Sequence, residues 1–344
     1  LDDISALRQI TPATASAPAT LFKPAAAYRF RWSKYPDTPI PPDEPWAHNP
    51  PDGAIIDYYL GGNTQGDAKL EIVEATGRVI RTYSSRDTSM APADIGNTPA
   101  YWIRPTQVLS AAPGFHRFVW DVHYAPPAGT SSQPGNYPIS ATPGDTPREP
   151  RGPWAAPGQY TVRLTVGGKS YTAPLTIKMD PRIKTTPVAL AQAHGMSVRL
   201  YDDIARDSAV AEHARVARDR LRAIRDLVAG NASLTDAIAA FDQQLVAVAG
   251  QTGGGGRRGG GGRGRGGAPG QPSFASINGE LLQLMSLIEE ADAEPTTQAA
   301  AAVRRAETEF DLLTTRWTTL RTTDLAVLNA KLKAAGQQPI AIPQ

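Results

Sequence analysis

The chain has 344 residues, of which 41% are hydrophobic, with 31 glycines, 31 prolines and no cysteine. Its 35 basic and 33 acidic side chains leave a formal net charge of +2, so no overall field draws it to nucleic acid or anionic lipid. The missing cysteines exclude disulfides, thiolate catalysis and cysteine-ligated metal sites. No apolar run reaches the length of a membrane-spanning helix. The sequence starts at Leu1, so we expect a processed or truncated chain.

Residues 1–45 are predicted to form an extended, proline-rich lead-in. The stretch Pro36–Pro42 has the composition of polyproline backbone. Because such a segment buries little surface by itself, its aromatic side chains either dock on a partner or pack on the chain's own strands. These side chains are Phe22, Tyr28, Phe30, Trp32 and Tyr35.

Residues 46–180 alternate between apolar and polar side chains, the period of β-strands. Glycine stands at the predicted hairpin turns, at Gly77 and at Gly167-Gly168, where positive φ is needed. About seven short strands with frequent turn signals predict an immunoglobulin-like antiparallel β-sandwich. The proline-rich excursion 125–157 is too long for a hairpin turn, so we expect a surface loop or edge extension.

Residues 185–336 change to helical spacing and are predicted to form an antiparallel helical bundle. Thr186-Pro187 has the pattern of a helix start, and Ser233 with Asp236 resembles a capping box. Apolar residues spaced three and four apart form four seams, and a slip of register at 322–324 predicts a separate terminal helix. The seams either pack on one another or mate with another chain. Residues 337–344 are a tail.

Each short motif that suggests a catalytic or ligand-binding site lacks the surrounding residues or secondary structure that such a site requires. Gly168-Lys169-Ser170 ends like a phosphate-binding loop, but position 163 is arginine and a strand follows. The five histidines lack metal-ligand spacing. The acidic cluster at 289–294 is explained by a helix start, where the dipole favours negative charge. We therefore expect no catalytic residue, no cofactor and no metal, and interpret the chain as not an enzyme.

The segment 251–271 is a Gly/Arg-rich loop between two predicted helices. It carries Arg257, Arg258, Arg263 and Arg265 among glycines and resembles RNA-binding tracts, but no aromatic residue is interleaved. We therefore expect no nucleic-acid partner. The loop is either a disordered surface insertion or a docking element for an acidic or lipid-headgroup surface. We assign these four arginines, with Trp32 and Tyr35, as candidate partner-binding residues.

Several short stretches resemble the C-terminal region of exported bacterial sortilin-like, BNR-repeat β-propeller proteins, which are often labelled glycosyl hydrolases. The strand-rich part is also similar to the immunoglobulin-like module of flagellar hook-capping proteins. The resemblance implies export to the periplasm or the cell surface. It transfers no catalytic residue, because the propeller is missing. The stretches are Leu1–Ser5, Leu21–Pro24, Asn49–Ala54, Trp120-Asp121, Ala156–Leu164 and Met179–Arg182.

These observations favour a non-catalytic, exported structural protein that acts through protein–protein contact. Standing without a propeller, it is expected to be an accessory subunit on the periplasmic side of a larger membrane assembly, respiratory or photosynthetic. Two alternatives stay open. One is an accessory C-terminal module of a β-propeller glycoside hydrolase. The other is a carbohydrate-binding module, which would use exposed aromatic side chains such as Tyr58, Tyr59, Trp102 and Trp154.

Overall fold

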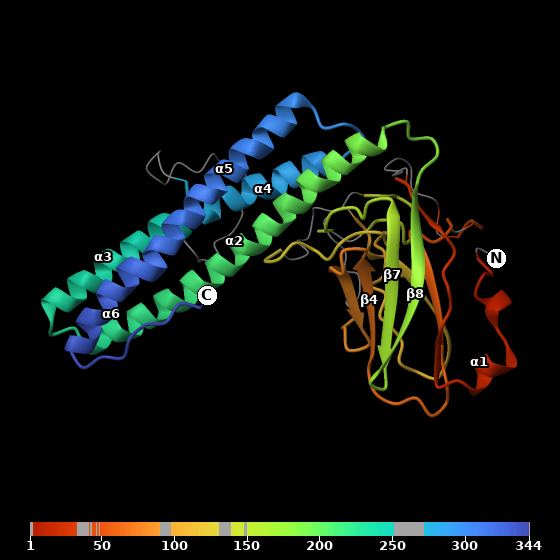
Figure 1. The fold of residues 1–344 in the computed structure, drawn as a ribbon, viewed down its shortest axis with the longest axis horizontal. Coiled ribbons are helices and arrows are strands. Elements are labelled where there is room, and N and C mark those ends of the chain that lie inside the picture. Colours follow the sequence, from red (N-terminus) through yellow and green to blue (C-terminus); the bar gives the residue numbers. More distant parts are fainter. Residues whose placement is uncertain are drawn as a thin grey trace. The chain divides into compact units, whose positions relative to one another are not determined.

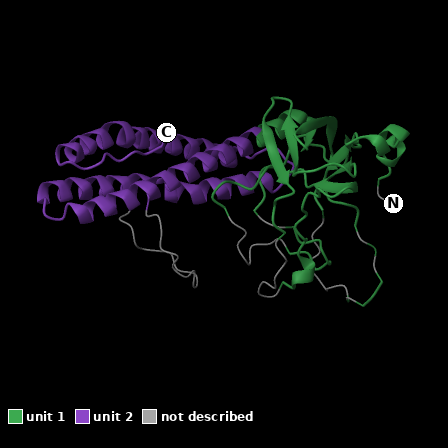
Figure 2. Ribbon diagram, turned by 90° about the horizontal axis from the view of Figure 1, so that it is seen from below, with its two compact units in different colours: residues 1–194 green, residues 195–344 purple. Residues whose placement is uncertain are grey.

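The computed structural model describes residues 3–32, 41, 43–45, 47, 49–89, 98–130, 139–147, 150–250 and 272–343. These residues form antiparallel sheets and the five helices α2 to α6, besides the short α1 (Pro12–Ser16) (Figure 1). The predicted mixture of a strand-rich part and a helical part is confirmed. The chain divides into two compact units, Leu1–His194 and Gly195–Gln344 (Figure 2). This division lies within α2, whereas we expected a boundary between residues 180 and 185.

The strands of unit 1 form two sheets. The three-stranded sheet has the order β1-β3-β6, and the five-stranded sheet, which curls into a half-barrel, has the order β2-β8-β7-β4-β5. Figure 1 shows β4, β7 and β8 side by side. The strands are β1 (Ala19–Leu21), β2 (Ala27–Arg29), β3 (Ala54–Leu60), β4 (Ala68–Glu74), β5 (Val79–Ser84), β6 (Gly114–Trp120), β7 (Gly158–Val166) and β8 (Lys169–Met179).

The lead-in contributes to both sheets, which its composition did not predict. Strand β1 pairs antiparallel with β3, and β2 pairs parallel with β8. The strands of residues 46–180 pair antiparallel, as predicted. Phe22 is buried, with its ring centroid 5.6 Å from that of Phe115. This aromatic side chain therefore packs on the chain's own strands. Strands of three residues are too short to show a period of two, which is why the pattern missed them.

Aromatic contacts join the two sheets. In β7 the buried residues alternate with more exposed ones, because successive side chains point to opposite faces of a sheet. Trp120 of β6 meets Tyr160 of β7 edge to face, with ring centroids 5.8 Å apart. Phe118 of β6 lies 4.5 Å from Tyr83 of β5 by the same measure. Gly167 and Gly168 take positive φ at the turn between β7 and β8, as predicted.

Of the two alternatives for the excursion 125–157, the surface loop is wrong, while an isolated antiparallel bridge between His123 and Trp154 agrees with an edge extension. Its described part returns into unit 1, where Trp154 and Ala155 are buried. The Tyr124 amide donates to the Pro153 carbonyl (2.9 Å), and the Ala155 amide donates to the Val122 carbonyl (2.8 Å). Backbone hydrogen bonds of this kind allow a segment without regular strands to be buried.

The helices of unit 2 bury the predicted seams on one another. Helix α3 (Ala232–Ala249) lies against α4 (Phe274–Glu289), α5 (Thr297–Thr319) and α6 (Leu325–Ala334). The seam residues Phe241, Leu281 and Phe310 are all buried. These three seams are therefore buried within this chain. Because α5 begins at Thr297, the expectation that the acidic residues 292 and 294 start a helix is wrong.

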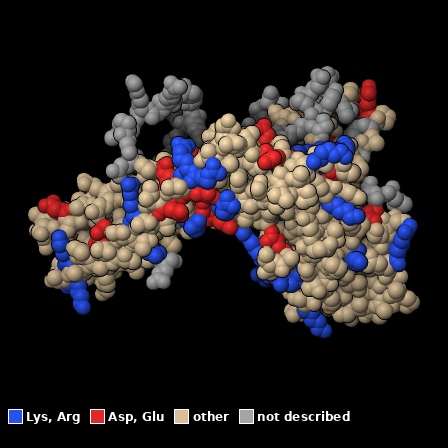
Figure 3. Space-filling model, turned by 45° about the horizontal axis from the view of Figure 1, so that its top comes forward, with Lys and Arg blue, Asp and Glu red and all other residues tan. Residues whose placement is uncertain are grey.

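The outer surface of α2 (Pro187–Leu227) carries charged side chains of both signs. Arg215 bonds Glu212 (2.7 Å) and Asp219 (2.9 Å), and Asp219 also bonds Arg222 (3.3 Å). The face of the molecule in Figure 3 shows the same mixture of blue and red. Exposed pairs of this kind add little stability.

The terminal helix predicted from the slip at 322–324 is α6, which begins at Leu325, but the chain reaches it without leaving the helical conformation. Residues Leu320–Asp324 form a π-helical turn that continues directly into α6. Before it, several threonine hydroxyls donate to the carbonyl four residues earlier, among them Thr318 to Thr314 (2.9 Å) and Thr322 to Thr318 (2.8 Å). Such bonds compete with the backbone ladder and bend helices. The extra residue of the π turn absorbs the slip in the seam.

The N-cap of α3 is Asn231 rather than the predicted Ser233. The Asn231 side chain accepts a hydrogen bond from the Leu234 amide (3.1 Å), and Ser233 lies within the first turn. We expect Asn231→Ala to lower the free energy of unfolding by about 1 kcal/mol, the usual loss for a helix cap. The measurement is urea unfolding of the full chain followed by helical circular dichroism.

Ser233→Ala is the matched control for this cap. It should leave the unfolding midpoint almost unchanged, since alanine is a better helix former than serine at an interior position. A larger loss for Ser233→Ala than for Asn231→Ala would restore the cap that the sequence predicted.

Candidate functional site

Of the predicted partner-binding residues, only Trp32 lies in the described part of the chain. Tyr35, Arg257, Arg258, Arg263 and Arg265 lie outside the described residues. Trp32 is half-buried, with its ring 4.7 Å from the Phe30 ring by centroids. Its indole N–H is buried and has no hydrogen-bond partner among the described residues.

A cluster of cations and aromatic rings surrounds Trp154 next to this segment of the lead-in. We call Arg29, Arg31, His123 and Trp154 the Trp154 cluster. The guanidinium carbons of Arg29 and Arg31 lie 5.3 and 5.5 Å from the Trp154 ring centroid, within the range of cation–π attraction. The His123 ring lies 3.8 Å from the same ring. Arg29 is buried, whereas Arg31 is half-exposed.

The Trp154 cluster keeps His123 uncharged. Burial lowers the pKa of His123 well below its usual range, and the positive charges of Arg151, Arg29 and Arg31 lower it further. The imidazole Nδ1 donates to the Asp121 carbonyl (2.7 Å), which fixes the tautomer. A neutral ring can lie against Trp154 between cations, where an imidazolium would be repelled.

A second cluster centres on Tyr124, and we call Glu74, Arg78, Tyr124 and His194 the Tyr124 cluster. The Tyr124 hydroxyl donates to the Glu74 carboxylate and lies 3.5 Å from Nε2 of His194. Arg78 lies over the Tyr124 ring at 5.6 Å. Glu74 ends β4 and His194 belongs to α2, so the hydroxyl joins segments that are 50 and 70 residues away from it.

The protonation of the Tyr124 cluster suits a structural network. Burial, and then the hydrogen bond to Glu74, raise the pKa of Tyr124, so the phenol keeps its proton. Burial also lowers the pKa of His194. Tyr124 is only 1% exposed. The arrangement therefore holds a neutral phenol between a carboxylate and a neutral imidazole, and it can anchor the first turns of α2 to the strands of unit 1.

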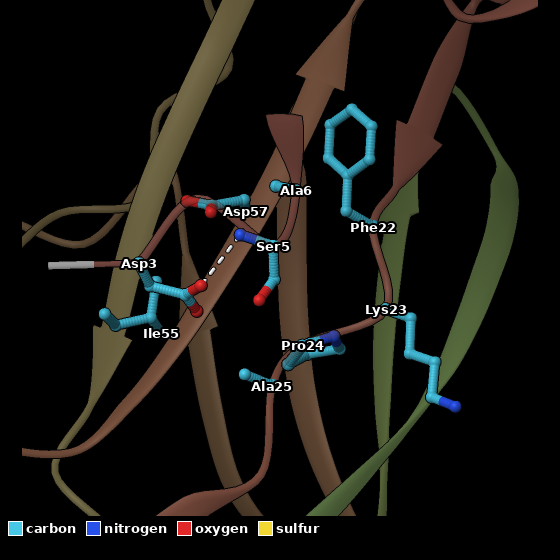
Figure 4. A pocket seen from close by; sticks show the side chains of 9 residues that line it. All are labelled: Asp3, Ser5, Ala6, Phe22, Lys23, Pro24, Ala25, Ile55 and Asp57. Atoms are coloured by element: carbon cyan, nitrogen blue, oxygen red, sulfur yellow. Dashed lines mark hydrogen bonds between the residues drawn. The ribbon is translucent and has the colours of Figure 1, made fainter. Parts of the chain in front are cut away.

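A small hollow lies between the start of the chain, residues 22–25 and β3 (Figure 4). Asp3 and Asp57 both line it, and Figure 4 shows the Lys23 side chain directed away from them. Arg117 binds both oxygens of Asp57, each at 2.9 Å. Burial raises the pKa of Asp3, but hydrogen bonds from Ser5 and the charge of Arg117 outweigh it and lower the pKa. The carboxylates are thus occupied by groups of the protein.

The structure also bears on metal binding, membrane spans and sugar binding. The described residues contain no group of three or more histidine, aspartate or glutamate side chains arranged for a metal ion. Among them, no helix has the combined length and apolar character of a membrane span. Of the aromatic candidates for sugar binding, Tyr58, Trp102 and Trp154 are buried and Tyr59 is half-buried, so they present no exposed platform.

Comparison of the chain with protein-family models, with curated proteins and with solved structures found no match.

The sequence alone did not indicate either cluster, apart from the choice of Trp32 beside it. Glu74, Tyr124 and His194 stand in unrelated sequence contexts, and no local motif relates them. The one available signal was the number of arginines and aromatic residues around the ends of the predicted strands.

Proposed function

We propose that this chain is a non-catalytic, exported structural protein that docks as an accessory subunit on the periplasmic side of a larger membrane assembly, respiratory or photosynthetic. At the finer level of fold, we propose an immunoglobulin-like sandwich for unit 1 and an antiparallel bundle for unit 2. The contacts of Trp120 with Tyr160 and of Phe118 with Tyr83 support the sandwich.

The observation that carries the proposal is the position of Arg31 and Trp32. Both are half-buried; Arg31 lies over the Trp154 ring, and the Trp32 ring packs against Phe30. Arginine and tryptophan dominate the binding energy of protein interfaces, where a rigid, packed surrounding limits the loss of side-chain entropy. The lead-in thus holds Arg31 against Trp154 and Trp32 against Phe30, so both side chains have packed neighbours that limit their freedom.

Co-purification tests this function. When the native membrane is dissolved in mild detergent, we expect the intact chain to co-purify with the subunits of one membrane complex in a fixed stoichiometric ratio. Trp32→Ala and deletion of residues 253–267 should each weaken the association without moving the melting temperature. Tyr101→Ala, which changes another exposed ring (48% exposed), is the control and should leave the association intact.

Three results would contradict the proposal. The intact chain could be extracted from the membrane without any other subunit, or its association could be insensitive to both changes. Alternatively, it could travel only with a β-propeller protein that hydrolyses glycosides, which would support the accessory-module alternative. Binding to protein-free vesicles that is lost on deletion of 253–267 would assign the loop to lipid headgroups instead.

A further inference from the structure

Unit 2 contains a buried carboxylate that the proposed function does not use. Asp207 lies on the core-facing side of α2, between the buried residues Ile204 and Val210, and is only 3% exposed. Burial of a charged group costs free energy unless its hydrogen bonds are replaced. Asp203 on the same helix is also buried, but it is paired with Arg206, so the burial of the Asp207 carboxylate needs an explanation of its own.

Asp207 has one hydrogen-bonded oxygen and one oxygen without a partner. Its Oδ2 accepts a hydrogen bond from the Asn278 side-chain amide of α4 (2.6 Å). Its Oδ1 is buried and has no partner among the described residues. An ionised carboxylate needs donors on both oxygens, whereas protonation removes the charge, whose burial costs the most free energy.

The charged groups around Asp207 are engaged elsewhere. On α2 itself, Asp203 is paired with Arg206. Glu307 and Asp311 of α5 act on Asp203, and Glu307 also binds Arg199 (2.7 Å). From α4 the group that reaches Asp207 is the uncharged Asn278 amide. Protonation of Asp207 is thus decided by burial and by this amide.

We propose that Asp207 and Asn278 form a proton-sensitive contact between α2 and α4, which is tight when the Asp207 carboxyl is protonated and opens more readily when it is ionised. This inference does not depend on the proposed docking function. Acid would strengthen this seam of unit 2, and neutral pH would loosen it.

The predicted direction of the pH effect follows from the linkage between proton binding and the stability of the contact. Burial raises the pKa of Asp207 from 3.8 to about 6, with the Asn278 hydrogen bond acting in the opposite sense. Between these two values the closed state binds more protons than the open state, so the stability of the contact falls as pH rises through this window. Above about pH 6 both states are ionised and the loss is complete.

Amide hydrogen exchange of the full chain measures this opening. We expect protection of the amides around Asp207 and in the first turns of α4 to fall about tenfold between pH 5 and pH 8, after correction for intrinsic exchange rates. In Asp207→Asn, which keeps the shape but cannot ionise, the tenfold change should be lost, leaving only the contribution of Asp203, whose pKa burial also raises. Asp203→Asn is the matched control and should keep the tenfold change.

A second variant reports on the same contact if Asp207→Asn does not fold. Asn278→Ala removes the bond that favours the ionised carboxylate, so the midpoint of the change should move to higher pH. The proposal is overturned if the wild-type protection is independent of pH, if Asp203→Asn abolishes the change while Asp207→Asn does not, or if Asn278→Ala leaves the midpoint in place or lowers it.

Discussion

Replacing Trp120 by alanine should lower the free energy of unfolding of unit 1 by about 4 kcal/mol, the cost of removing a large buried aromatic side chain from a core. Trp120 is 0% exposed. Its ring meets Tyr160 of the other sheet, and its indole N–H donates to the His123 carbonyl (2.9 Å). The change therefore removes the contact between the sheets and a hydrogen bond that positions the residue next to Tyr124. Urea unfolding, with hydrogen exchange of the β7 amides, measures the loss.

Two companion variants separate these contributions. Trp120→Phe keeps most of the buried ring and loses the indole N–H, so it should cost less, about 1–2 kcal/mol for the lost hydrogen bond and ring volume. Tyr28→Ala removes a ring that is 47% exposed and should change the unfolding midpoint little. A Trp120→Ala protein as stable as Tyr28→Ala would show that this contact is not central to unit 1.

The second large effect is expected for Gly152→Ala, with a loss of about 3 kcal/mol, as for an overpacked core. A Cβ atom at residue 152 would lie 2.2 Å from the Ala125 carbonyl oxygen and 2.8 Å from the Tyr124 Cβ. The oxygen belongs to the backbone and cannot rotate away, so the returning segment 150–155 has to shift. Because Trp154 and the neighbours of Tyr124 lie on this segment, we expect the Trp154 and Tyr124 clusters to loosen together. Thermal unfolding and the near-ultraviolet circular dichroism of the aromatic residues measure both effects.

Gly158→Ala is the matched control in the same unit. A Cβ atom there meets nothing within 4 Å, so the variant should be neutral or slightly more stable, because alanine lowers the entropy of the unfolded chain. The assigned path of the excursion would be wrong if both glycine variants were equally stable.

The helical part was predictable from the sequence because its signal is local and repeated. Leu281 and Phe310 recur at helical spacing with their neighbours, and both are buried where the pattern placed them. The details of the helix ends were less predictable. At the start of α3, Asn231 and Ser233 are both good cap residues, and only the geometry of the turn selects Asn231. At 320–324 the shift in the spacing of apolar residues was visible, but a new helix and a π turn within a continuous helix produce the same shift in a sequence.

The strand-rich part was predictable only for its longer strands. β7 shows a clear period of two, whereas β1 and β2 have three residues each and resemble the loops around them. The excursion 125–157 was misjudged because proline content excludes regular strands but does not exclude burial. Irregular segments can be buried when their backbone groups are paired, as those of Tyr124 and Ala155 are.

By itself, the amino-acid sequence determined which of the longer stretches of this protein are strands and helices, because hydrophobic periodicity is a property of near neighbours in the chain. Only the tertiary structure decided that Arg31 lies on Trp154, that Glu74, Tyr124 and His194 meet, and that Asp207 is buried against Asn278. The partners in these contacts are far apart in the sequence, and their protonation depends on burial, which arises only when the whole unit packs.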